Sequence, residues 1–327
     1  MMKKLTKARI LVTGGAGFIG SNLVEHLLAQ GNEVTVLDNF ATGKMENLLA
    51  FAGKAEFHLI VGDIRNLDDC RRAAAGMDYI LHEAALGSVP RSIKDPMTTT
   101  AVNILGFVNM LYAAQEAKVK RFVYAASSST YGDSKTLPKV EDKIGSPLSP
   151  YAITKFVDEL YAKNFHDLYG IDTIGLRYFN VFGRRQDPFG AYAAVIPKFV
   201  MSLMKHESPV INGDGSYSRD FTYVDNVIQA NELALLAEDP EAVNQVYNVA
   251  CGERTTLNEL FACLRENLSV FDPAIAEVEA QYGPNRAGDI PHSLACIDKA
   301  KKLLGYAPEF SVRAGLKEAS EWYFRHL

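Results

Sequence analysis

The stretch "TGGAGFIG", residues 13–20, decides the fold of this chain. The run before it, "ARILVT" (8–13), is apolar and β-branched, which is typical of a buried strand. The stretch after it, "IGSNLVEHLLAQG" (19–31), repeats apolar residues at helical spacing and ends on a glycine. The sequence therefore predicts a strand, a glycine-rich turn and a helix in immediate succession.

Three glycines in this turn follow the spacing G-x-x-G-x-x-G. Gly14 allows the tight turn, Gly17 lets the backbone approach a pyrophosphate, and Gly20 lets the helix pack closely on the strand. The N-terminus of the helix adds free N–H groups and the positive end of its dipole. This combination predicts a dinucleotide-binding loop.

The next strand, "EVTVLD" (33–38), ends on Asp38, 18 residues after Gly20. A carboxylate there accepts hydrogen bonds from the adenosine ribose and repels a 2′-phosphate. No arginine follows within "NFATGK" (39–44), so we expect NAD rather than NADP. Asp63, in "GDI" (62–64), lies either in a plain turn or beside the adenine.

Strands and helices alternate through the first half of the chain, which predicts right-handed crossovers and a parallel sheet covered on both faces. We expect an α/β fold with a Rossmann-type, doubly wound sheet in residues 1–180. After about residue 180, glycine and proline separate shorter elements, so 181–327 is expected to form a smaller mixed α/β substrate domain, with the chain returning to the first domain around 220–255. The remaining expected elements are strands at 56–63, 79–85 and 121–127 and helices at 103–119 and 148–170.

The spacing Tyr-x-x-x-Lys occurs at Tyr131/Lys135 and at Tyr151/Lys155. Turn-forming residues follow Tyr131 and leave Lys135 without a helix. The second pair lies in the helical pattern 148–170, where residues four apart share one face. A lysine ammonium near a phenol favours the phenolate, so the second pair is the candidate for proton transfer.

Five motifs, in this order, resemble the extended short-chain dehydrogenase/reductase family: "TGGAGFIG", "HEAA" (82–85), "AASSSTYG" (125–132), "SPYAITK" (149–155) and "RYFNVFG" (177–183). Within that family the chain is most similar to the UDP-hexose 4-epimerases. The resemblance covers nearly the whole chain. It implies tightly held NAD, a C-terminal UDP-sugar domain and a homodimer.

The resemblance also implies the residues of the site. Tyr151 would act as the base, Lys155 would assist it, and Ser127 would relay the hydrogen bond between the sugar 4-hydroxyl and Tyr151. Hydride would leave C4 for the nicotinamide and return to the other face of the 4-keto sugar. Tyr151 and Lys155 would also contact the cofactor, as would Gly14, Gly17, Gly20, Asp38 and Asp63, which are described above. The other implied cofactor contacts are Phe18, Ile19, Asn39, Gly43, Ile64, Ala84, Ala85 and Tyr178.

The implied substrate contacts begin with Asn180, which would face the phosphates, and with Arg219 and Arg286, whose guanidinium groups suit phosphate oxygens. Asp289 would accept from the uridine ribose. The full set includes Ser127 and Tyr151 and adds Gly87, Ser88, Ser128, Ser129, Gln186, Val195, Lys198, Asn212 and Ser293.

The expected sugar depends on Ser293, four residues after Asp289, where some epimerases restricted to glucose and galactose carry tyrosine. A small residue leaves room for a 2-N-acetyl group, so the chain resembles the UDP-N-acetylglucosamine 4-epimerase subgroup. An epimerase for a UDP-hexosaminuronate is the close alternative, with Arg91 or Arg184 facing the C6 carboxylate.

Two other functions are less favoured. A 4,6-dehydratase needs an Asp-Glu pair where this chain has Ser128 and Ser129. A catalytically silent NAD sensor or RNA-binding relative would not need Ser127, Tyr151 and Lys155 intact.

The composition limits the binding partners and the cellular compartment that we expect. The 327 residues are 48% hydrophobic with a net charge of −5, so no general affinity for nucleic acid or an anionic membrane is expected. No membrane span and no signal peptide are expected. The four cysteines have no metal-ligand spacing; we expect them to be reduced, with no metal bound, in a cytoplasmic protein.

Overall fold

Seven parallel strands form the central sheet in the order β11-β6-β5-β4-β1-β2-β3. The structure is a computed structural model that describes residues 4–189, 194–284 and 290–327. Successive residues of β1 pack to opposite faces, with Ile10 and Val12 in one core and Leu11 in the other. The strands are β1 (Arg9–Thr13), β2 (Glu33–Asp38), β3 (Phe57–Val61), β4 (Tyr79–His82), β5 (Arg121–Ser127), β6 (Thr173–Tyr178) and β11 (Gln245–Val249).

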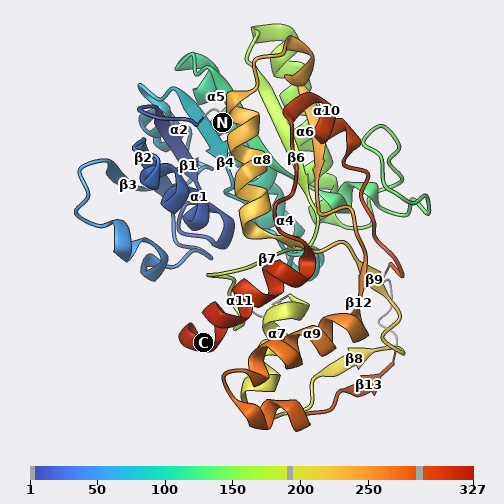
Figure 1. Cartoon of the computed structure of the whole chain (residues 1–327). Helices are drawn as coiled ribbons and strands as arrows, with labels where there is room; N and C mark the ends of the chain where they lie inside the picture. Colours follow the sequence, from blue (N-terminus) through green and yellow to red (C-terminus); the bar gives the residue numbers. More distant parts are fainter. Residues whose placement is uncertain (1–3, 190–193, 285–289) are drawn as a thin grey trace.

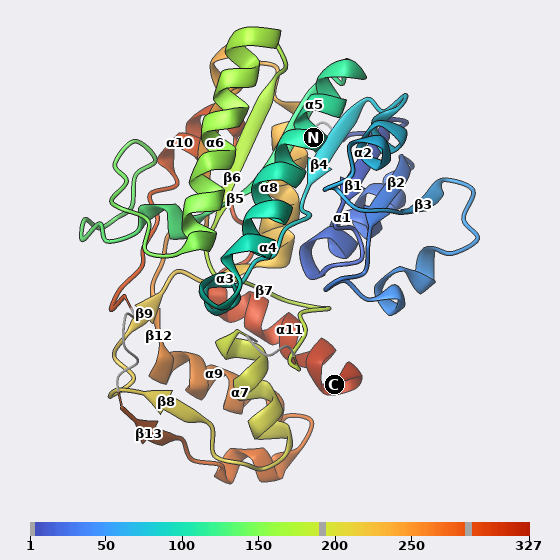
Figure 2. The ribbon, with the colours of Figure 1, turned by 180° about the vertical axis from the view of Figure 1, so that it is seen from behind.

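Helices cover both faces of this sheet (Figures 1 and 2). One face carries α1 (Phe18–Ala29), α8 (Val224–Leu236) and α10 (Asp298–Leu304). The other face carries α2 (Leu67–Ala74), α5 (Gly106–Glu116) and α6 (Pro150–Tyr169). The α/β, Rossmann-type doubly wound sheet predicted from the sequence is confirmed.

Two predicted elements have different bounds in the structure. The strand expected at 79–85 ends at His82, so residues 83–85 leave the sheet and enter a loop. The helix expected at 103–119 begins earlier, as α4 (Pro96–Thr100), and continues through a π-helical turn at Ala101–Leu105 into α5. α3 (Val89–Lys94) precedes it.

A second group of elements lies beyond the carboxyl ends of the strands, in the lower part of Figure 1. Its core is a separate apolar cluster around α7 (Val195–Met204), α9 (Leu257–Ser269) and α11 (Val312–His326). Between these helices run three short strand pairs: β7 (Val181–Phe182) with β10 (Thr222–Tyr223), β8 (Val210–Asn212) with β13 (Gln281–Gly283), and β9 (Ser218–Arg219) with β12 (Thr255–Thr256).

The helical segment Pro96–Glu116 is apolar enough to pass a test for membrane spans, with a mean hydropathy of 1.2. From the sequence, no membrane span was expected there. In the structure it packs along α6, and α5 also packs on α2. Core helices of soluble folds commonly pass the same test, so the segment is weak evidence for a membrane.

The side chain of Asn32 connects the start of the chain to the end of α1, the helix that follows the glycine loop. Its side chain is fully buried and accepts from the Ala8 N–H at 3.1 Å. It donates to the carbonyl oxygens of Leu5 at 2.9 Å and Leu27 at 3.0 Å. The Ala8 N–H and the Leu5 carbonyl oxygen therefore depend on one amide, whereas the Leu27 carbonyl oxygen also accepts from the backbone N–H groups of Gln30 and Asn32.

We expect Asn32→Ala to lower the free energy of unfolding by about 2–4 kcal/mol, because it leaves two buried backbone groups, the Ala8 N–H and the Leu5 carbonyl oxygen, unpaired. Asn66→Ala is the matched control: it removes one bond to the Asp68 N–H at the start of α2 and should cost about 1 kcal/mol. Denaturant unfolding of both variants measures the difference, and equal losses would contradict this account of Asn32.

Candidate active site

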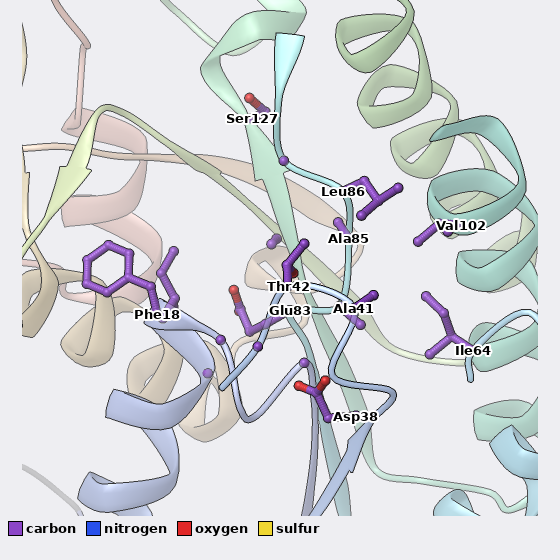
Figure 3. Close-up of a pocket in the computed structure, with 18 of the residues that line it drawn as sticks. Phe18, Asp38, Ala41, Thr42, Ile64, Glu83, Ala85, Leu86, Val102 and Ser127 are labelled. Atoms are coloured by element: carbon purple, nitrogen blue, oxygen red, sulfur yellow. The ribbon is translucent and has the colours of Figure 1, made fainter. Parts of the chain in front are cut away.

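A cavity of about 580 Å³ lies at the carboxyl ends of the central strands, where sheets of this winding bind ligands. The glycine loop, the loops after β2, β3 and β4, the end of β5 and the start of α6 form its wall, and Figure 3 shows part of it. Every residue that we expected to contact the cofactor lines this cavity: Gly14, Gly17, Phe18, Ile19, Gly20, Asp38, Asn39, Gly43, Asp63, Ile64, Ala84, Ala85, Tyr151, Lys155 and Tyr178.

The glycine loop forms a cradle that larger residues would fill. Gly14 has a φ of +69°, and a Cβ there would lie 2.8 Å from backbone atoms of Ala84. A Cβ on Gly20 would lie 2.3 Å from the carbonyl oxygen of Gly14. Helix α1 starts at Phe18 with Gly17 as its N-cap and no side-chain cap, so its first N–H groups remain available at the cavity wall. This arrangement fits the pyrophosphate of a dinucleotide.

Asp38 lies at the end of β2, where an adenosine ribose is expected. Its carboxylate accepts from the N–H groups of Ala16 at 2.9 Å and Phe40 at 2.8 Å, and it is 7% exposed. These two bonds fix a carboxylate at the cavity wall, where it favours ribose hydroxyls over a 2′-phosphate.

Arg65 lines the same end of the cavity and was missed in the sequence, because we searched for arginines only directly after Asp38. Its guanidinium donates to Asp63 from Nη2 at 2.6 Å and from Nε at 3.0 Å. The hydrogen bonds from Arg65 are the main cause that lowers the pKa of Asp63 to about 2. Asn39 donates a further bond to Asp63 at 2.9 Å. The charge of Arg65 is therefore compensated by a permanently ionised partner.

The other end of the cavity holds Tyr151 and Lys155, one turn apart on α6. The Lys155 ammonium is 3% exposed and donates to the Ala125 carbonyl oxygen at 2.9 Å. It also lies 3.4 Å from the carboxylate of Asp158. Burial raises the pKa of Asp158 to about 7, against the lowering effect of Lys155. Lys155 is thus held between β5 and the next turn of its own helix.

The three consecutive serines have different positions. Ser127 ends β5 and its oxygen accepts from the N–H of Ser129 at 3.1 Å and from the hydroxyl of Ser129 at 2.9 Å. Ser127 and Ser128 line the cavity, whereas Ser129 is not among the residues that line it. Because both bonds are donated to the oxygen of Ser127, its own hydroxyl hydrogen remains free to donate elsewhere.

Tyr131 has a structural position, as its sequence context indicated. Its side chain is 2% exposed, and its hydroxyl donates to the Asn248 side chain at 2.7 Å. Burial raises the pKa of Tyr131 to about 12. Lys135 lies outside any helix. The pair Tyr131/Lys135 is therefore not a proton-transfer pair.

Glu83 lines the cavity and was also missed, although it lies within a motif that carried the family resemblance. Its carboxylate accepts from the Tyr178 hydroxyl at 2.8 Å, and Asn231 donates to that hydroxyl at 2.9 Å. Burial raises the pKa of Glu83 to about 7, and the Tyr178 bond and the charge of Lys155 lower it. The available signal was a carboxylate near the carboxyl end of the strand predicted at 79–85, at the edge where ligands bind.

Asn103 lies in the π-helical turn and connects two walls of the site. Its amide donates to the Thr154 hydroxyl on α6 at 3.0 Å and accepts from the Leu86 N–H at 2.8 Å. Asn103 is 2% exposed. It fixes the loop after β4 to the helix that carries Tyr151.

The expected substrate contacts are divided between the cavity and its surroundings. Gly87, Asn180 and Gln186 line it together with Ser127, Ser128 and Tyr151. Arg286 and Asp289 lie outside the described residues. The remaining expected contacts are not among the residues that line it: Ser88, Ser129, Val195, Lys198, Asn212, Arg219 and Ser293.

Arg219 and Ser293 nevertheless lie close to each other. Arg219 donates to the carbonyl oxygens of Ser218 at 3.0 Å and Pro291 at 3.2 Å. The Ser293 N–H donates to the Ser218 carbonyl oxygen at 3.0 Å, so β9 and the segment after residue 289 run together. β9 belongs to the second group of elements, in the lower part of Figure 1.

Arg184 has acidic partners of its own. It donates to Asp225 at 2.7 Å and lies 3.6 Å from Glu25. Neither Arg184 nor Arg91 is among the residues that line the cavity. No group of three or more metal-ligating side chains occurs among the described residues, and the four cysteines are free.

The chain is similar to known proteins over nearly its whole length. Residues 10–250 match the model of the NAD dependent epimerase/dehydratase family. A putative UDP-glucose 4-epimerase of Methanocaldococcus jannaschii is 38% identical over 96% of this chain and 97% of its own. The structure of a UDP-N-acetylglucosamine 4-epimerase from Methanobrevibacter ruminantium, in complex with UDP-N-acetylmuramic acid, has a TM-score of 0.92 and 38% identity over 99% of this chain and 100% of that one.

A UDP-glucuronic acid 4-epimerase from Bacillus cereus, solved with UDP-glucuronic acid and NAD, has a TM-score of 0.86 and 30% identity over 97% of this chain and 99% of its own. Similarity of this extent, together with a cavity built for a dinucleotide, identifies the chain. It belongs to the NAD dependent epimerase/dehydratase family of extended short-chain dehydrogenases/reductases, and its cofactor is NAD.

Proposed function

We propose that the protein is a UDP-sugar 4-epimerase that interconverts UDP-N-acetylglucosamine and UDP-N-acetylgalactosamine, and also UDP-glucose and UDP-galactose. The observation that carries the reaction is the meeting of Ser127, Tyr151 and Lys155 at one end of the dinucleotide cavity. The relatives are consistent with it, since their names describe 4-epimerases of UDP-sugars. The family and the cofactor are established; the sugar and the residue roles are the proposal.

Each side chain has a defined role in this reaction. Bound NAD supplies the acceptor and donor of the hydride at C4. Tyr151 takes the proton of the sugar 4-hydroxyl and later returns it to the same oxygen. Lys155, one turn after Tyr151 on α6, assists it from the same end of the cavity. Ser127, whose oxygen is occupied by Ser129, donates its hydrogen toward the sugar oxygen.

The N-acetylated sugar is supported by small residues where the sugar is expected. Gly87 and Ser128 line the cavity and present little bulk. Gln186 also lines it and offers an amide, although its Nε2 donates to the Val181 carbonyl oxygen at 3.1 Å. Ser293 is held beside β9 by a backbone bond and leaves more room than a tyrosine would.

A uronate substrate has less support from the contacts. An epimerase for a UDP-hexosaminuronate needs a cation near the C6 carboxylate. Arg184 is engaged by Asp225 and Glu25, and Arg91 is not among the cavity residues. A 4,6-dehydratase is disfavoured as well, because Ser128 and Ser129 occupy the places of its acid–base pair.

We further propose a homodimer that pairs the outer faces of α4–α5 and α6, which lie together in Figure 2. Several large apolar side chains are exposed on these helices, and large exposed apolar patches mark protein interfaces. The exposed fraction reaches 79% at Met97. The other exposed members are Leu105, Tyr112, Ile153, Leu160, Tyr161 and Leu168.

We also propose which parts of the chain bind the cofactor and which bind the UDP-sugar. Residues 1–180, with α8 and β11, hold NAD, and the remainder of 181–327 holds the UDP-sugar. The α8–β11 segment joins the first part because it packs on the central sheet. Four free cysteines fit a reducing cytoplasm, where we place the enzyme.

Tyr151→Phe tests the proton-transfer role. We expect a fold and an NAD content like those of the wild type and a loss of about 100-fold to 10,000-fold in kcat, because the acid–base group is removed. Tyr131→Phe is the matched control: it loses a buried hydrogen bond worth about 1–3 kcal/mol of stability and keeps the activity of the folded protein. A wild-type rate in Tyr151→Phe would exclude the proposed base.

Ser293→Tyr tests the choice of sugar. We expect kcat/KM for UDP-N-acetylglucosamine to fall at least roughly tenfold more than kcat/KM for UDP-glucose, because the phenol takes the space of the N-acetyl group. Ser269→Tyr, at the end of α9, is the control and should change neither. Equal losses on both sugars would remove Ser293 from the account of specificity.

The dimer proposal predicts a molecular mass in sedimentation equilibrium of twice one chain. Replacing Met97 and Leu160 together by glutamate should yield monomers, since two like charges per subunit would face each other in the interface. Val270→Glu is the control, because Val270 is 77% exposed on the second group of elements. A wild-type chain that sediments as a monomer would refute the proposal.

A further inference from the structure

The carboxyl of Glu83 lies at the catalytic end of the cavity. Tyr178, its hydrogen-bond partner, is paired with Ser127 across β5 and β6. The positive charge of Lys155 lowers the pKa of Glu83. Asp38 lies at the opposite, adenosine end. In the proposed function, the nicotinamide must lie beside the reacting sugar carbon, at the end that holds Glu83.

The ionisable neighbours of Glu83 come from three elements. Tyr178 belongs to β6, Lys155 belongs to α6, and His82 is the last residue of β4, directly before Glu83. Tyr151 of α6 lines the same cavity. Burial lowers the pKa of His82 to about 3, so His82 stays neutral at physiological pH. On α8, the uncharged Asn231 donates to the Tyr178 hydroxyl.

Glu83 lines the cavity and uses one of its two carboxyl oxygens for a bond within the protein. Among the described residues, the Tyr178 hydroxyl is the one hydrogen-bond partner of this carboxyl. Figure 3 draws Glu83 among the side chains of the cavity wall. The carboxyl can therefore interact with a bound molecule without giving up its internal bond.

The two redox forms of the cofactor differ in charge at this end of the site. The oxidised nicotinamide ring carries one positive charge and the reduced ring carries none. A carboxylate in a water-poor cavity attracts a nearby cation much more strongly than it would in water. An ionised Glu83 therefore discriminates between the two forms, and a protonated Glu83 does not.

We propose that Glu83 sets the redox preference of the bound NAD, favouring its oxidised form, and that reduction of the ring is accompanied by uptake of a proton at Glu83. The inference rests on the proposed placement of the nicotinamide but not on the identity of the sugar. In balance, two electrons and one proton enter the ring as a hydride, and a second proton passes from solvent to the carboxylate. An epimerase must hold its NAD in the oxidised form at the end of each turnover. The negative charge of Glu83 disfavours an enzyme that retains the reduced cofactor.

The pH dependence follows from the sign of the interaction. The cationic ring lowers the pKa of Glu83, and the neutral ring leaves that pKa at the level to which burial raises it. Above both pKa values the carboxylate is ionised in both states and favours oxidised NAD. Below both values it is neutral and has no preference. Between them, reduction takes up the extra proton.

The test is an anaerobic redox titration of the purified holoenzyme against a mediator dye of known potential, without any sugar. The absorbance of the reduced nicotinamide gives the ratio of NADH to NAD⁺. Glu83→Gln retains an acceptor for the Tyr178 hydroxyl but carries no charge. We expect it to raise this ratio roughly tenfold at about pH 9, which is about 30 mV for a two-electron couple, and to match the wild type at about pH 5.

Asp158→Asn is the necessary control, because the pKa of Asp158 is also raised to about 7 and Asp158 contacts Lys155. The ring's own proton changes the ratio about tenfold per pH unit. We expect a steeper dependence near pH 7 in the wild type and in Asp158→Asn, but not in Glu83→Gln.

The proposal is overturned if Glu83→Gln and the wild type have equal ratios at every pH, or if the extra proton disappears in Asp158→Asn instead. Should Glu83→Gln lose its NAD or fail to fold, the slope of Asp158→Asn decides alone: about tenfold per pH unit throughout rejects the proposal. Because the titration contains no sugar, failure on every UDP-sugar would reject the proposed epimerase without affecting this result.

Discussion

The buried ammonium of Lys155 is the interaction on which the catalytic end of the cavity depends. A charge with 3% exposure is costly unless it is compensated, and the Ala125 carbonyl oxygen and Asp158 compensate it. The bond to Ala125 fixes α6 against the end of β5. Since Tyr151 lies one turn before Lys155 and Ser127 two residues after Ala125, the same bond brings both to one cavity.

The two ends of this cavity differ in how firmly their charges are fixed. At the adenosine end, Arg65 keeps Asp63 ionised, with a pKa of about 2. At the catalytic end, burial raises the pKa of Glu83 and of Asp158 to about 7. The first end is therefore suited to constant recognition of a nucleoside. The second can exchange protons in the pH range in which hydride and proton are transferred.

Features encoded within one local segment could be predicted from the sequence. The glycine loop, Asp38 and the pair Tyr151/Lys155 each depend on a strand end or a helix face that periodicity reveals. Glu83 and Arg65 were missed because their roles depend on which loops meet at the carboxyl edge of the sheet. Sugar contacts such as Ser293 belong to the second group of elements, whose short strands and long loops carry little periodic signal.

The central claim is that the sugar is oxidised and reduced again at C4 within one binding event. The most direct measurement uses UDP-N-acetylglucosamine carrying deuterium at C4, followed by separation of the C4 epimers and mass spectrometry. The account predicts UDP-N-acetylgalactosamine that retains the deuterium at C4, because the label leaves to the bound cofactor and returns from it. Epimerisation with loss of the label to solvent, or no C4 epimer from any UDP-hexose, would contradict it.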